Sequence, residues 1–168
     1  MRTAWLPALG PMVLAPVCAE YLWGYDDSTR HPETLIGNLI VFSPWYGAPA
    51  LLIRELARRR RLGWPGILLL AAAFGVLEAA IVDQSMWSTN YRDIPYWEEM
   101  STPTYVGPIG LSLYLALSFV GGHVILSIGS PIALVETLSP LEGTSVGSRH
   151  WWWSGWSSRR SSSVNGPP

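Results

Sequence analysis

Four long apolar stretches dominate the chain, and charged residues are largely confined to the segments between them. Leu35 to Ile53 runs 19 residues without an ionisable side chain, and Trp64 to Val82 runs 19 residues with Glu78 as its one interruption. A helix needs about 20 apolar residues to cross about 30 Å of hydrocarbon, where every backbone group must be paired internally. The pattern therefore predicts an all-α polytopic membrane protein. We expect a bundle of four transmembrane helices within residues 1–141, with spans at about 4–23, 35–53, 64–82 and 106–134.

The first stretch differs from the others because it contains three prolines. Each proline lacks a backbone donor and favours a kink, which membrane helices tolerate when neighbouring groups bind the freed carbonyl. An alternative interpretation is a cleaved signal peptide, with Arg2 as its charged start and a small-residue cleavage site around Cys18. Three prolines are unusual in a signal core, so we favour a retained membrane anchor.

The fourth stretch, Thr104 to Leu134, is longer than one span requires. Its 31 residues would extend about 46 Å as a straight helix. Three features can absorb the excess: tilt, an interfacial start before Pro108, or a break at Gly121–Gly122. The sequence leaves these three alternatives open.

The loops differ in charge, and this difference predicts the orientation. The loop between the second and third stretches is rich in arginine, whereas the two flanking loops are mostly acidic. Short arginine-rich loops stay cytoplasmic, so we expect insertion in the cell inner (plasma) membrane with both termini cytoplasmic. A net charge of −1 gives no reason to expect a nucleic-acid partner. The side chains expected to contact anionic lipid headgroups at that face are Arg54, Arg58, Arg59, Arg60 and Arg61.

Three ionisable residues inside the apolar stretches are the candidates for chemistry: Glu20, Glu78 and His123. Such residues are costly in a bilayer and commonly functional. Glu20 and Glu78 lie near the outer ends of their spans, at similar depth. We therefore hypothesise that they form a pair that shares one proton. The alternative is two separate polar groups, each satisfied by its own surroundings.

His123 is predicted to lie deeper than the two carboxylates. On straight helices it would sit about 10–15 Å below them. A metal or catalytic site formed by all three residues would therefore need a broken fourth helix, because metal ligands converge within about 2.0–2.2 Å of one ion. We predict neither a metal nor a cofactor.

Small residues recur every fourth position in the third stretch, at Ala71, Gly75 and Ala79. Such a stripe lets another helix approach closely, so it predicts a helix–helix contact. Glu78 lies beside the stripe and is expected to point toward protein instead of lipid.

Several motifs carry a resemblance to known proteins. The proline-rich first stretch, the segment Ala19 to Tyr25 and the Gly-Gly-His motif ending at His123 resemble uncharacterised multi-pass membrane proteins of high-GC bacteria. Intramembrane Glu and His are also found in CAAX-type intramembrane proteases. Their diagnostic pair of glutamates, followed four residues later by arginine, is absent from this chain.

These observations leave three classes of function. The absence of a complete catalytic motif favours a non-enzymatic membrane component or helper subunit. The first alternative is a small proton-coupled transporter element that uses Glu20 and Glu78. The second is an intramembrane hydrolase that uses those carboxylates with His123. The acidic and aromatic loop from Asp83 to Pro103 is either an interfacial segment or a docking surface for an extracytoplasmic ligand.

The character of the sequence changes after about residue 142. The last 27 residues contain four tryptophans and many serines without a helical period. Residues 142–168 are therefore predicted to form an unstructured tail. A frameshift product is the other interpretation, since out-of-frame GC-rich codons commonly encode Arg, Ser, Gly, Pro and Trp.

Overall fold

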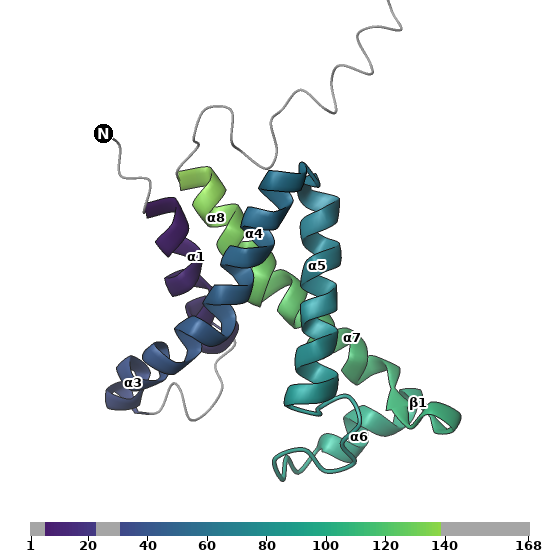
Figure 1. The fold of residues 1–168 in the computed structure, drawn as a ribbon. Coiled ribbons are helices and arrows are strands. Elements are labelled where there is room, and N and C mark those ends of the chain that lie inside the picture. Colours follow the sequence, from purple (N-terminus) through teal and green to yellow (C-terminus); the bar gives the residue numbers. More distant parts are fainter. Residues whose placement is uncertain (1–5, 23–30, 139–168) are drawn as a thin grey trace, which may run out of the picture.

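The computed structural model describes residues 6–22 and 31–138, and these residues form an antiparallel bundle of helices (Figure 1). Four helical segments follow one another along the chain. The first consists of α1 (Leu6–Pro16) and the π turn η1 (Val17–Tyr21). The second consists of α3 (Pro32–Phe42), the π turn η2 (Ser43–Gly47) and α4 (Ala48–Arg60). The third consists of α5 (Gly63–Leu77) and the π turn η3 (Glu78–Val82), and the fourth of α7 (Leu113–Gly122), the π turn η6 (His123–Gly129) and α8 (Ser130–Leu138).

Three of these segments are long and apolar enough to cross a membrane. Among the described residues they are Thr34–Arg60, Gly63–Val82 and Leu113–Leu138, and a shorter apolar helix covers Leu9–Tyr21. The predicted all-α membrane class is therefore confirmed. The first of the four expected spans corresponds to this shorter helix.

The packing is that of a membrane protein, with large aliphatic side chains outside and small ones inside. Leu69 and Leu117 are 73% and 76% exposed, whereas Ala50 and Ala71 are fully buried. Lipid tails are as apolar as leucine, so burying leucine gains little in a bilayer, while small residues let helix backbones come close. The core consequently consists of close helix contacts at alanine and glycine, completed by isoleucines.

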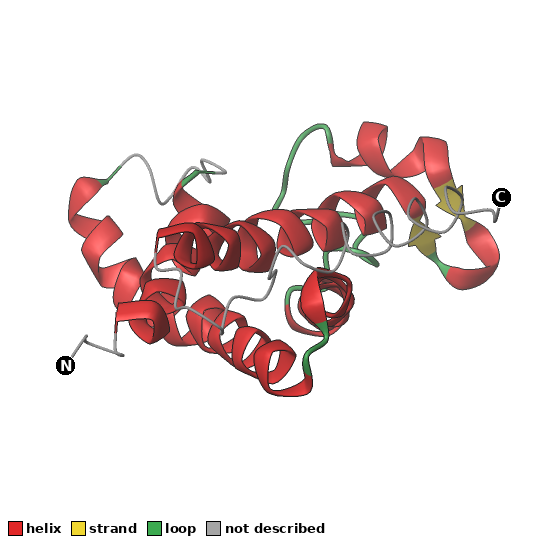
Figure 2. Ribbon diagram, turned by 90° about the horizontal axis from the view of Figure 1, so that it is seen from above, coloured by secondary structure: helices red, strands yellow, loops and turns green. Residues whose placement is uncertain are grey.

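The elements run up and down the bundle. The start of α1, the turn between α4 and α5, and the end of α8 all lie at one end, which we call the arginine end because it carries Arg58–Arg61 (Figure 1). The loop after η3 lies at the opposite end. Figure 2 shows the same helices from above, with the two short strands at one edge of the molecule.

Within the described residues, the helices contain four π turns, and three of them adjoin a proline. Pro16 precedes η1, η2 contains Pro44, and Pro131 follows η6. Proline has no N–H to complete the α-helical ladder, and its ring clashes with the carbonyl four residues earlier. A π turn adds one residue and shifts the backbone pairing, so each of these three helices changes its pairing near a proline and continues.

The fourth helix begins at Leu113, seven residues later than the expected start at 106. The excess apolar residues form a small hairpin, β1 (Tyr105–Val106) and β2 (Leu111–Ser112), paired antiparallel and linked by the 3-10 turn η5 (Gly107–Ile109). Before the hairpin come α6 (Trp97–Ser101) and the 3-10 turn η4 (Thr102–Thr104). The helix therefore starts after a turn, because Pro108 and Gly110, with its positive φ of 63°, turn the chain back. The interfacial position of this start stays a prediction. The helix continues through Gly121–Gly122 without a break.

The second helix ends at Arg60 instead of Ile53, and this changes the environment of Arg54. Arg54 was expected to contact lipid headgroups from a loop, but its side chain is only 2% exposed and lies inside α4. The helix can continue past this charge because Glu136 of α8 pairs with it. Arg61, at a φ of 53°, then ends the helix in a tight turn.

Some predictions concern residues outside the described part of the chain. They are the position of Arg2, the fate of the predicted tail 142–168 and its frameshift alternative.

Candidate functional site

The four π turns carry polar and aromatic side chains that meet inside the bundle. We call this set the polar cluster. Its members are Glu20 of η1, Trp45 and Tyr46 of η2, Glu78 of η3, and His123 and Ser127 of η6. π turns are rare and occur frequently at functional sites. Their coincidence with all the intramembrane ionisable candidates makes this cluster the candidate site.

Two adjacent residues of η2 bind the two intramembrane carboxylates. The Tyr46 hydroxyl donates a hydrogen bond of 2.7 Å to Glu20 Oε1, and the Trp45 indole N–H donates one of 2.9 Å to Glu78 Oε1. Glu78 is 4% exposed and Glu20 is half-buried. Hydrogen bonds of this kind satisfy part of a carboxylate's demand where water is scarce. Trp45 and Tyr46 therefore join the first and third spans through the second.

His123 belongs to the same cluster. Its ring stacks on Tyr46 with centroids 6.0 Å apart and meets the edge of Phe74 at 5.8 Å. His123 Nδ1 lies 3.0 Å from Ser127 Oγ, one turn further along the helix. The imidazole is thus held by two aromatic rings, one stacked and one perpendicular, and at one nitrogen by a hydroxyl.

This position corrects the predicted depth of His123. A Cβ placed on Gly75 would lie 3.1 Å from His123 Cβ, so His123 is level with a residue only three positions before Glu78. The predicted depth assumed that the fourth helix starts near Pro108. The helix begins at Leu113, which places His123 ten residues, or about 15 Å, from its start.

The small-residue stripe of the third span has its partner within the same chain. Ala71 and Ala79 are fully buried, and Gly75 packs against His123 and the backbone of Val120. The predicted helix–helix contact is therefore made with the fourth span of the same chain. The close approach that glycine permits is what brings the imidazole into the cluster.

The cluster is electrostatically connected to the loop of residues 83–103, which we call the outer loop after the orientation that the sequence predicts. The negative charge of Asp83, the residue after η3, interacts with the charges of Glu20, Glu78 and His123. The positive charge of Arg92 attracts Glu20. Glu20 and Glu78 also repel one another. In the loop itself, burial and the negative charge of Asp83 raise the pKa of the Tyr91 phenol, so Tyr91 stays neutral.

The polar cluster is held together by hydrogen bonds and ring contacts. In the described part of the chain, no three His, Cys, Asp or Glu side chains are placed to hold one metal ion. The carboxylates instead face a phenol and an indole, and the imidazole faces a hydroxyl. These groups form a hydrogen-bonded and stacked set that can hold and exchange protons without ligating a metal.

The match to a family model covers this whole arrangement. It extends over residues 11–151, from α1 to beyond the end of α8. The chain belongs to an uncharacterised membrane protein family. The polar cluster and every π turn lie within the part that matches this family. No curated protein and no solved structure matches the chain.

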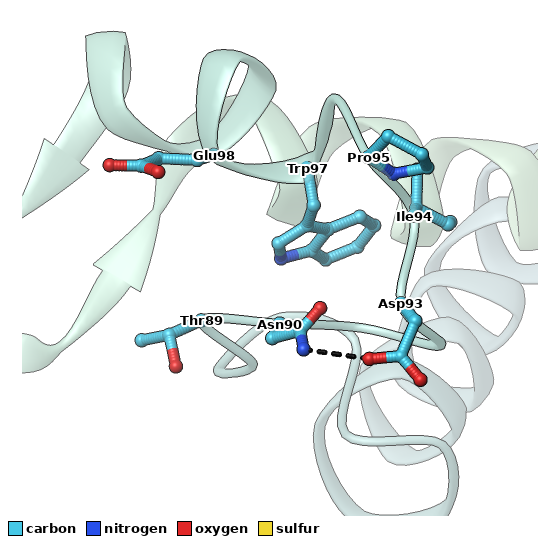
Figure 3. Close-up of a pocket in the computed structure, with 7 residues that line it drawn as sticks. All are labelled: Thr89, Asn90, Asp93, Ile94, Pro95, Trp97 and Glu98. Carbon is cyan, nitrogen blue, oxygen red and sulfur yellow. Dashed lines mark hydrogen bonds between the residues drawn. The ribbon is translucent and has the colours of Figure 1, made fainter.

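Two pockets in this family member lie outside the polar cluster, around α6. One of about 360 Å³ is lined by Thr89, Asn90, Asp93, Ile94, Pro95, Trp97 and Glu98 (Figure 3). The other, of about 430 Å³, shares Thr89 and Glu98 with it and extends to the hairpin. Trp97 is nearly fully buried, packs against Tyr91 and Phe119 with its ring tilted to theirs, and donates its indole N–H to the Ser88 carbonyl. It therefore anchors the outer loop on the fourth helix.

Sequence reasoning found the ionisable members of the cluster but missed the aromatic ones and a second polar site. Trp45 and Tyr46 lie inside an apolar run, where they are counted as core residues. Their signal is the pair of prolines, Pro44 and Pro49, that flank them and mark an irregular turn. The second site is the Arg54–Glu136 ion pair. The sequence signal for it is a pair of opposite charges. Arg54 follows the second apolar stretch, Glu136 follows the fourth, and both stretches end on the same side of the membrane.

Proposed function

We propose that this protein is a small, non-enzymatic, proton-coupled membrane component in which the polar cluster binds and exchanges protons. The observation that carries the proposal is the hydrogen bonding of Glu20 and Glu78 by two adjacent residues of one π turn, with His123 stacked on one of them. Ionisable groups in the bilayer commonly mark proton relays in pumps and transporters.

The arrangement supports sharing of protons among the groups. Two carboxylates in a poorly hydrated place cannot both ionise freely, so their titrations are coupled. The Tyr46 hydroxyl that binds Glu20 belongs to the same ring that stacks on His123, so a change in charge at one group is felt at the others. The hydrogen-bonded aromatics hold the carboxylates in place while the charge changes.

Infrared titration of the carboxyl bands tests this proposal on the full chain in vesicles. We expect the midpoint of the Glu78 band to move in the Glu20→Gln variant, and the Glu20 band to move in Glu78→Gln, because each carboxylate senses the other's charge. Tyr46→Phe should move the Glu20 band without loss of fold. Glu98→Gln, which removes an exposed carboxylate of the outer loop, is the matched control and should move neither.

Two carboxyl bands that titrate independently in every variant would refute the shared cluster. A cellular phenotype separates the remaining classes. If Glu78→Gln and His123→Ala both behave as wild type, the proton-coupled and the hydrolase functions are excluded and a scaffold function is left. If His123→Ala alone has an effect, the carboxylates are not the carriers.

We further propose that the arginine end is cytoplasmic and that the outer loop is extracytoplasmic, in the inner (plasma) membrane. Arg59, Arg60 and Arg61 are exposed at the arginine end, where anionic headgroups can bind them. A membrane-impermeant thiol reagent added to sealed cells should label Asn90→Cys and spare Arg59→Cys, both in a Cys18→Ala background. Labelling of the Arg59→Cys variant from outside would reverse the orientation.

A further inference from the structure

A second polar site lies between α4 and α8, toward the arginine end. Arg54 Nε and one terminal nitrogen both contact Glu136 Oε1, at 2.8 and 2.7 Å, and the other terminal nitrogen contacts Glu55 at 2.9 Å. Arg54 is 2% exposed and Glu136 is 11% exposed. This is a buried ion pair between the second and fourth spans.

An apolar layer separates this ion pair from the polar cluster. It consists of Ala50, Ile53, Ile67, Ala71, Ile128 and Ile132, all between 0% and 9% exposed. Along the second span, Arg54 lies eight residues from Tyr46, or about 12 Å. The polar cluster, the apolar layer and the ion pair therefore follow one another along the bundle toward the arginine end.

We propose that the apolar layer and the Arg54–Glu136 pair form the inner gate of the polar cluster, and that this gate is closed in the structure. The proposal rests on the proposed function, because the apolar layer lies between the polar cluster, where protons would be held, and the arginine end. Breaking the pair would remove the charged contact that joins α4 to α8. Water would then enter between the two helices to solvate the remaining buried charge.

The chain's one cysteine reports on this gate. Cys18 lies in η1, two residues before Glu20, and is 3% exposed. Vesicles containing the full chain are treated from the arginine end with a membrane-impermeant maleimide. We expect slow labelling of wild type, and labelling faster by about tenfold or more in Arg54→Gln and in Glu136→Gln, because each variant removes the charged contact between α4 and α8.

Two further variants keep the interpretation unambiguous. The charge swap Arg54→Glu with Glu136→Arg restores the pair and should restore protection of Cys18. Arg58→Gln removes an arginine that contacts Glu55 at 3.0 Å and is not among the residues of the Arg54–Glu136 pair, so it should label as slowly as wild type.

Protection of Cys18 in both single variants would overturn the gate. Equal acceleration from both sides of the membrane would also overturn it, since that result describes a loosened bundle instead of an opened inner end. The labelling rate measures how easily the maleimide reaches Cys18, and it does not depend on proton binding. A failure of the infrared coupling would therefore count against the proposed function without altering the labelling result.

Discussion

Replacement of Gly47 by leucine is expected to leave no folded protein. Gly47 ends η2, immediately after Tyr46, and faces α1. A Cβ at this position would lie 2.6 Å from both the Cα and the carbonyl oxygen of Met12. Both are backbone atoms and cannot rotate away, so even one methyl group forces α1 off the second span.

The alanine variants give a graded test of the same contact. Gly47→Ala should destabilise the protein by about 1–3 kcal/mol through overpacking. Gly37→Ala is the matched control, because a Cβ on Gly37 of α3 has nothing within 4 Å. It should stabilise the protein by up to about 1 kcal/mol, since alanine favours helix over glycine.

The two variants are compared by denaturant or thermal unfolding of the purified protein in one detergent. The expected results have opposite signs, which separates the close approach from a general effect of helix propensity. If Gly47→Ala is as stable as Gly37→Ala, α1 does not lie against η2. Glu20 could then not be held by Tyr46 as described.

The sequence predicted the helical spans well because their cause is local. Lipid requires a continuous run of apolar residues in a helix, and such runs are visible without knowledge of any neighbour. The boundaries were less predictable because they depend on partners. Arg54 ends an apolar run, yet the helix passes it, since Glu136 from a distant part of the chain neutralises it.

The candidate site shows the same division. Glu20, Glu78 and His123 stand out from the sequence because charge is rare in a span. The similar depth of Glu20 and Glu78 suggested a pair, but the approach of His123 to them could not be predicted, since it depends on where the fourth helix starts. The hairpin at Tyr105 to Ser112 takes up residues that a straight helix would have used, and this raises His123 to the level of Gly75.

The convergence itself is the central claim, and a disulfide between positions 75 and 123 tests it most directly. A Cβ on Gly75 would lie 3.1 Å from His123 Cβ. A small shift brings this distance to the Cβ–Cβ separation of about 3.5–4.5 Å that disulfides require. The double variant Gly75→Cys with His123→Cys is prepared in a Cys18→Ala background and treated with a mild oxidant in the membrane. The control pairs Gly75→Cys with Gly121→Cys, whose Cβ has nothing within 4 Å.

We expect nearly complete formation of the intramolecular bridge between positions 75 and 123, and little between positions 75 and 121. A straight fourth helix that began near Pro108 would carry position 123 about 10–15 Å deeper than the carboxylates and away from Gly75. No bridge between positions 75 and 123, or a yield no higher than that of the control, would contradict the convergence of the four spans on one polar cluster.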